Sequence, residues 1–261
     1  MTYGLGWIPD SKKTPGQKQD YNAEVVLYQA SDLPSAVSNR DLIVSILNQG
    51  RLGSCTANAA MQAVRGSHIK QGAVNPPLGS RLFPYYGARA SIGQTAVDSG
   101  ASLRDLFWNL AHFGFCREDI WPYSDDTSAG ALFARMPSSN AFRMAYDQSA
   151  VYRKILTGGA ELVLDLKRAL AARYLVVFGT LVGDTFVSNP GDKPISPPNQ
   201  DTVLGGHALA IDGYDEGDNF DIVNSWGPEF NGDGHIQFTA DYLTWQSSGD
   251  FWIVDAAPIF S

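Results

Sequence analysis

One cysteine in this chain has surroundings that could support chemistry. A polar, glycine-containing stretch, residues 48–54, leads into Cys55. The apolar residues that follow have the spacing of one buried helical face: Ala57, Ala60, Met61 and Val64. Ser54 is suited to be the N-cap of that helix. Unpaired N–H groups and the positive end of the helix dipole favour an anion in the first turn, so the sequence predicts a Cys55 thiolate with a lowered pKa.

Two residues far downstream have types that could assist such a nucleophile. His207 begins an apolar, strand-like run, and Asn224 ends the next one. A histidine can exchange a proton with a thiol, and a neutral amide can orient the histidine by accepting its ring N–H. An isolated cysteine is more often a small buried hydrophobe, and an isolated histidine more often structural. The three residues together favour nucleophilic catalysis.

Short motifs around these residues resemble the papain-like cysteine peptidases, particularly their bacterial members. The motifs are Gln49 six residues before Cys55, Gly53-Ser54-Cys55, Gly206-His207-Ala208 and Asn224-Ser225-Trp226-Gly227. His207 and Asn224 follow Cys55 by 152 and 169 residues, close to and slightly beyond the roughly 130–150 typical of this family. The resemblance covers about residues 33–256. Thr56 and Leu52 stand where the family usually has an aromatic residue and a cysteine, departures that concern packing and a disulfide.

The resemblance implies a role for each residue of the site. Cys55 would attack a peptide carbonyl, while His207 forms an imidazolium and then protonates the leaving amine. Asn224 would orient His207, and Trp226 would shield that hydrogen bond from water. The Gln49 side chain and the Cys55 backbone N–H would form an oxyanion hole. No metal or cofactor is implied.

Substrate recognition is expected from backbone groups beside the nucleophile. Ser99 and Gly100 fall where the family carries a glycine pair that binds an extended substrate, and Gly206 precedes the histidine. A plain loop before the next helix explains Ser99 and Gly100 equally well. Residues 124–150 contain no histidine pair of the kind that makes some relatives carboxypeptidases. The expected activity is therefore that of an endopeptidase on peptide or protein substrates.

The pattern of elements predicts an α+β, two-lobed papain-like fold. Residues from about 41 to 150 read mainly as helices, with a capped helix from Ser102 to Gly114. Residues from about 151 to 250 begin with a helix at 161–172 and continue as strands: 175–182, 208–211, 220–224, 236–238 and 251–254. We expect an antiparallel, barrel-like sheet in this second lobe, with the active site in the cleft between the lobes.

The ends of the chain lie outside the family-like part. Residues 1–32 read as an extended arm, with Tyr3, Trp7, Ile8 and Pro9 as its apolar anchors, and residues 257–261 as a short tail. By resemblance the arm is a short inhibitory pro-segment that runs opposite to substrate and so escapes cleavage. A merely packed or loose arm is the alternative. So is a catalytically silent binding protein on the same fold, with its cleft permanently filled.

Composition limits the partners of the protein. The net charge is −8, and no basic cluster is present, which argues against nucleic acid or an anionic membrane as a partner. No segment has the length and apolar character of a membrane span or the pattern of a signal peptide. Two cysteines, Cys55 and Cys116, do not form a disulfide framework. We expect a monomer in the cytoplasm for the chain as written, while export by another route stays open.

Overall fold

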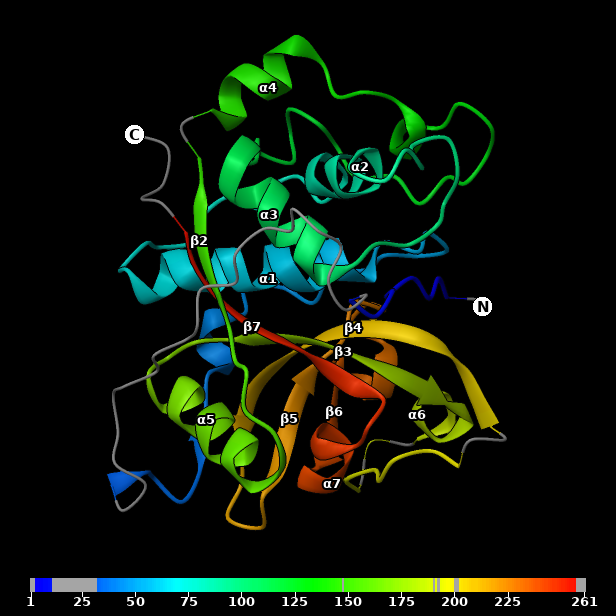
Figure 1. Ribbon diagram of the computed structural model, residues 1–261. Helices are drawn as coiled ribbons and strands as arrows, with labels where there is room; N and C mark the ends of the chain where they lie inside the picture. The colour runs from blue at the N-terminus through cyan, green and yellow to red at the C-terminus, as the bar shows by residue number, and fades with distance from the viewer. Residues whose placement is uncertain are drawn as a thin grey trace.

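The computed structural model describes residues 3–10, 32–146, 148–189, 191, 193–199 and 202–256. The arm from 11 to 31 and the tail at 257–261 lie outside the described residues. Four helices form one side of the molecule: α1 (Cys55–Lys70), α2 (Leu82–Ala90), α3 (Leu103–Phe113) and α4 (Ser139–Ala145). Figure 1 shows α1 crossing the middle, between the other three helices and the sheet.

The other side is built on an antiparallel sheet. Its strands are β1 (Val37–Ser38), β2 (Ala150–Lys154), β3 (Val176–Gly183), β4 (Val203–Tyr214), β5 (Asn219–Val223), β6 (His235–Thr239) and β7 (Ser248–Ala256). They are ordered β2-β7-β3-β4-β5-β6, and β1 pairs with β4. Three helices accompany the sheet: α5 (Gly159–Ala171), α6 (Asp184–Ser188) and α7 (Ala240–Thr244). Helices gathered on one side of an antiparallel sheet are the α+β arrangement that the sequence predicts.

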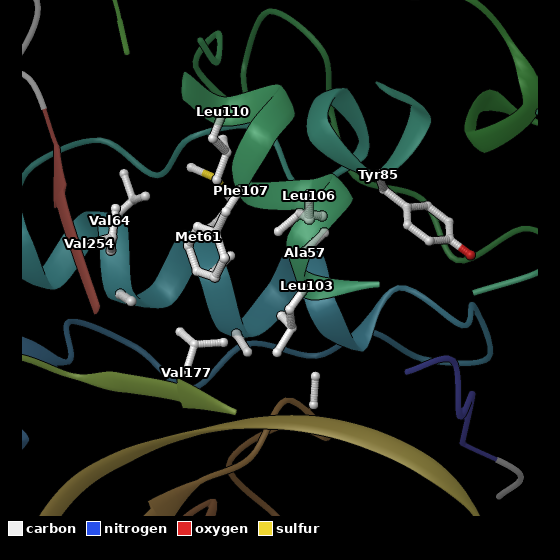
Figure 2. Close-up of a cluster of buried hydrophobic side chains, with 14 of the residues drawn as sticks. Ala57, Met61, Val64, Tyr85, Leu103, Leu106, Phe107, Leu110, Val177 and Val254 are labelled. Carbon is white, nitrogen blue, oxygen red and sulfur yellow. The ribbon is translucent and has the colours of Figure 1, made fainter. Parts of the chain in front are cut away.

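Helix α1 is the central element because it is covered on nearly every side. All but one of the residues from Cys55 to His68 are buried. Figure 2 shows Met61 and Val64 near α3 side chains such as Phe107 and Leu110, while Val177 of β3 lies on the sheet side. A helix enclosed in this way cannot shift without disturbing both layers. Its first residue, Cys55, is therefore held in a fixed position.

The two predicted N-caps turn out differently. Ser102 accepts the Asp105 N–H at 3.1 Å, so the cap predicted for α3 is confirmed. Ser54 occupies the N-cap position of α1, but its side chain makes no capping hydrogen bond. Its hydroxyl lies 2.6 Å from the Tyr123 hydroxyl and accepts a bond from Asn58 Nδ2 at 3.1 Å. Ser54 is therefore the N-cap residue that the sequence predicts, but its hydroxyl binds Tyr123 and Asn58 and leaves the backbone of the first turn without a side-chain cap.

Strand β2 is one of the elements that the sequence does not predict. It spans Ala150–Lys154, at the predicted change from helices to strands, and pairs along its whole length with β7. Its partner lies about a hundred residues later in the chain, a distance over which local patterns carry no pairing information. None of the helices in the described residues is both long and apolar enough to span a bilayer.

Candidate active site

The three predicted catalytic residues lie on elements that pack against one another, α1 on β4 and β4 beside β5. Cys55 is the first residue of α1, His207 lies in β4, and Asn224 follows β5 directly. His207 Nε2 lies 2.9 Å from Asn224 Oδ1, which also accepts the Ser225 N–H at 2.8 Å. Because that second donor identifies the Asn224 atom as an oxygen, Nε2 carries the proton of the neutral ring. The other ring nitrogen, Nδ1, has no hydrogen-bond partner among the described residues.

Trp226 covers one face of this histidine. The two ring centroids are 5.0 Å apart, and Trp226 itself is buried. Phe186 of α6 makes an edge contact with His207 as well. The predicted shield and histidine are thus in direct contact, in apolar surroundings that strengthen a hydrogen bond.

Gln49 is fully buried, and its amide is fixed at both ends. The Ser225 hydroxyl donates to Gln49 Oε1 at 2.6 Å. The Gln49 amide nitrogen then faces the cleft, where it donates to the Gly4 carbonyl at 2.8 Å and to the Leu52 carbonyl at 3.0 Å. The sequence reading missed Ser225 as the residue that orients Gln49, although it lies inside the Asn-Ser-Trp-Gly motif.

Arm residues 3–10 pass through the site in an extended conformation. Gly4 N–H donates to the Gly50 carbonyl, and Trp7 N–H donates to the Gly206 carbonyl, each at 3.1 Å. The Tyr3 ring stacks on Trp226 with centroids 4.4 Å apart. In Figure 1 this segment lies beside the start of α1 and β4. The segment predicted to restrict the cleft therefore touches the surroundings of every proposed catalytic group.

Ala101 supplies the opposite wall for this segment. Its N–H donates to the Gly6 carbonyl at 2.8 Å, and its carbonyl accepts the Ile8 N–H at 3.1 Å, in a parallel bridge with Trp7. The sequence reading placed this pairing at Ser99 and Gly100. The Ser99 hydroxyl instead donates to the Gly100 carbonyl at 3.2 Å. Gly100 has no side chain, which lets the Gly6 backbone of the arm lie close to it.

Three glycines make room for the segment. A Cβ at Gly100, where φ is +74°, would lie 2.1 Å from the Gly6 carbonyl oxygen. A Cβ at Gly206 would lie 2.3 Å from the Trp7 carbonyl oxygen, and one at Gly179 would lie 2.0 Å from the Trp7 indole. Gly100 and Gly206 are two of the residues expected to bind substrate, and in this structure the arm lies against them. Gly179, on β3, carries no local signal and was missed.

Burial changes the charge state expected for the reacting groups. Cys55 and His207 are both inaccessible to solvent. Burial raises the pKa of the Cys55 thiol to about 11, although the nearby N–H groups of Ala208 and Gly6 oppose the rise. Burial also lowers the pKa of His207 to about 4, outweighing its bond to Asn224. The predicted low pKa of Cys55 is therefore wrong for this state: the pair is a neutral thiol and a neutral imidazole.

The second cysteine, Cys116, is buried away from these groups in a small apolar cluster with Phe83, Ala141 and Ala145. Both cysteines are free thiols. Burial raises the pKa of Cys116 to about 12.

Comparison with known proteins identifies the family. No family model matches the chain. A peptidase C1-like protein of Acanthamoeba polyphaga mimivirus is 32% identical over 232 residues, which cover 85% of this chain and 71% of the viral protein. Xylellain, a cysteine protease from Xylella fastidiosa, is 31% identical with a TM-score of 0.81, over 100% of this chain and 97% of xylellain.

A more distant solved structure shares the fold. Procathepsin B S9 from Trypanosoma congolense has a TM-score of 0.70 at 14% identity, covering 98% of this chain and 86% of its own. The predicted papain-like α+β fold is confirmed. The chain belongs to the papain-like cysteine peptidase family.

Proposed function

We propose that the protein is a cysteine endopeptidase held inactive by its own N-terminal arm. The observation that carries the proposal is the hydrogen bond from Gln49 Nε2 to the Gly4 carbonyl, 2.8 Å long, beside a buried Cys55. Gln49 is the donor expected to stabilise the oxyanion of a peptide under attack. A carbonyl of the arm uses that donor, so a substrate must displace the arm before it can react.

Release of the arm would convert the reacting pair to its charged form. With Gly6 and Trp7 gone, water reaches Cys55 and His207, and the burial that favours the neutral thiol and imidazole is lost. The proton passes from Cys55 Sγ to His207 Nδ1, the ring nitrogen without a partner among the described residues. Asn224 holds the other ring nitrogen and fixes the ring orientation.

The reaction then follows from these positions. The Cys55 thiolate attacks the carbonyl carbon of a peptide bond, and Gln49 Nε2 with the Cys55 N–H stabilises the oxyanion. His207 donates its proton to the departing amine, and the C–N bond breaks to leave a thioester on Cys55. His207 next removes a proton from water, which attacks the thioester and releases the carboxylic acid and the thiol.

The direction of the arm explains how it can occupy the site without being cut. The arm is parallel to the chain at Ala101. We propose that a substrate lies antiparallel to the chain at Ala101. Its peptide bonds would then face Cys55 in the opposite direction to those of the arm. Parallel pairing is then the mark of an inhibitor, and antiparallel pairing that of a substrate.

Comparing the full chain with a form lacking residues 1–32 on a fluorogenic peptide tests this function. The trimmed protein should have the higher kcat/KM, and Cys55→Ser in either form should abolish cleavage. Because Trp7 belongs to the buried core, full-length Trp7→Ala provides a second way to open the cleft. Inactivity of all opened forms that keep their fold would instead favour the silent binding protein. The full burial of Cys55 is the observation that keeps this alternative open.

A further inference from the structure

The described part of the arm ends at Asp10, which lies in a cluster of charged side chains. The other members of the cluster are Arg104, Lys154 and Asp250. The Asp10 carboxylate pairs with Arg104 Nε and lies 3.4 Å from Lys154 Nζ. Lys154 also pairs with Asp250 Oδ1 at 2.8 Å, and the Asp10 N–H donates to Asp250 Oδ2 at 3.1 Å. Among the described residues, two cations and two carboxylates are thus interleaved, and one carboxylate comes from the arm.

The cluster is set into the protein and does not lie on its surface. The side chains of Arg104 and Lys154 are only 13% and 14% exposed, and that of Asp250 is 8% exposed. Both cations lie over the buried ring of Trp252, with Arg104 Cζ at 5.8 Å and Lys154 Nζ at 4.9 Å from its centroid. Arg104 is in the first turn of α3, Lys154 ends β2 and Asp250 is in β7. Three elements of the fold therefore hold these groups in place.

Departure of the arm unbalances the charge of the cluster. Asp10 leaves with the arm, so Arg104 and Lys154 lose one of the carboxylates that the described residues place against them, while Lys154 keeps Asp250. Partly desolvated cations are costly unless a negative group accompanies them. The protein as a whole carries a net charge of −8, so this local positive site is not part of a general basic surface. Its chemistry favours a carboxylate as replacement.

We infer that Arg104 and Lys154 form a carboxylate-binding subsite of the cleft, which holds Asp10 in the closed state and an acidic substrate side chain in the open one. The inference rests on the proposed peptidase function and adds to it a substrate class. A cavity of about 420 Å³ follows the arm from Trp7 to Asp10 and is bordered by Asp250. In the arm, Asp10 lies three residues after Trp7, a span of roughly 10 Å in an extended chain. An extended substrate should therefore carry its acidic side chain three positions from the side chain that takes the place of Trp7.

Paired peptides test the subsite with the full-length protein. An aspartate is moved through every position on both sides of the scissile bond of a fluorogenic peptide, and each peptide is matched by one with asparagine. The arm competes equally with both members of a pair, so the ratio of their kcat/KM values is independent of how often the cleft is open. We expect one position at which aspartate is favoured on the order of tenfold, with a preference that weakens as salt is added.

Variants identify the residues responsible. Arg104→Gln and Lys154→Gln should each bring the ratio at that position close to one. Arg153→Gln is the matched control, because it removes the same charge from the neighbouring β2 residue, whose partner is Asp255; its ratio should equal that of wild type. Equal cleavage of aspartate and asparagine peptides at every position by the wild-type protein would overturn the subsite alone. The same pairs are measured on full-length Trp7→Ala, whose cleft is open, and failure of both proteins to cleave any peptide would remove the proposed function, and the subsite with it.

Discussion

Two buried histidines in the same sheet show how a partner decides the charge of a side chain. His207 in β4 faces the neutral amide of Asn224 at 2.9 Å. His235 in β6 lies 3.4 Å from the Asp212 carboxylate. Burial lowers the pKa of both rings, and for His207 it prevails, leaving the pKa at about 4. For His235 the Asp212 carboxylate outweighs burial, and the pKa is raised.

The comparison explains why an amide suits the proposed reaction. A carboxylate partner raises the pKa of His235 and so favours its charged form. A neutral partner lets the charge of His207 depend on its surroundings, namely the Cys55 proton and the presence of the arm. Acid also acts oppositely on the two sites: protonation of His207 works against the closed state as the pH falls from 6.5 towards about 4. His207 is thus a responsive group, and His235 a structural one.

Replacing each histidine by glutamine should separate these roles, with the largest effect at His207. Loss of the proton-transfer group in His207→Gln should lower kcat by about 10³-fold. His235→Gln, measured where the protein remains folded, should keep kcat within about twofold, because His235 contacts no proposed reacting group. Both values come from steady-state assays on arm-trimmed protein. Similar losses of kcat in the two variants would show that the two histidines do not have different roles.

The second largest effect on kcat is expected at Gln49, which is proposed to stabilise the oxyanion and does not act on either histidine. Removing one oxyanion donor by Gln49→Ala should lower kcat by about 10² to 10³ with little change in KM. Ser225→Ala keeps the amide but removes the bond to Gln49 Oε1, so a smaller loss of kcat is expected. An unchanged kcat and kcat/KM in Gln49→Ala would exclude Gln49 from the oxyanion hole.

The smallest effect is on stability and tests the His235 side of the comparison. The pKa of Asp212 is raised by burial, despite the opposing effect of His235, and the pKa of His235 is raised as well. Groups whose pKa is raised by folding stabilise at low pH and lose that contribution as the pH rises through the folded value. The contribution of this pair to the free energy of unfolding should therefore fall as the pH rises, from above 3.8 for Asp212 and from above 6.5 for His235.

Asp212→Asn should flatten or reverse that dependence, by about 1–2 kcal/mol across the window. Urea unfolding of both proteins at several pH values measures it, with Asp221→Asn as a control for the loss of one charge nearby. A variant with the same slope as wild type would show that the Asp212 and His235 pair does not titrate as described.

The residues that the sequence selects for the site each have a local signature. Cys55 begins a helix with a clear apolar face, and His207 and Asn224 stand at the ends of strand-like runs. Gln49 belongs to the same loop as Cys55. The arm was also placed beside the cleft, from its aromatic anchors and its position before the family-like part.

The remaining features depend on contacts between distant parts of the chain. Ala101 and Gly179 matter because an arm segment about a hundred or more residues away lies against them, and nothing in their own neighbourhood reveals it. The pKa of Cys55 was misjudged for the same reason: the helix dipole is visible in the sequence, but the arm and strand β4 that bury the thiol are not.

The rate at which Cys55 reacts with iodoacetamide, followed across pH, tests most directly the claim that the arm closes the cleft and keeps the pair neutral. Mass spectrometry separates Cys55 from Cys116, and the wild-type chain is compared with full-length Trp7→Ala. In the wild type we expect slow modification that accelerates only as the pH approaches about 11. In Trp7→Ala, Cys55 should react rapidly near about pH 6, as an ion-paired thiolate does. Rapid reaction of wild-type Cys55 near about pH 6, or the same slow profile in both proteins, would contradict the account.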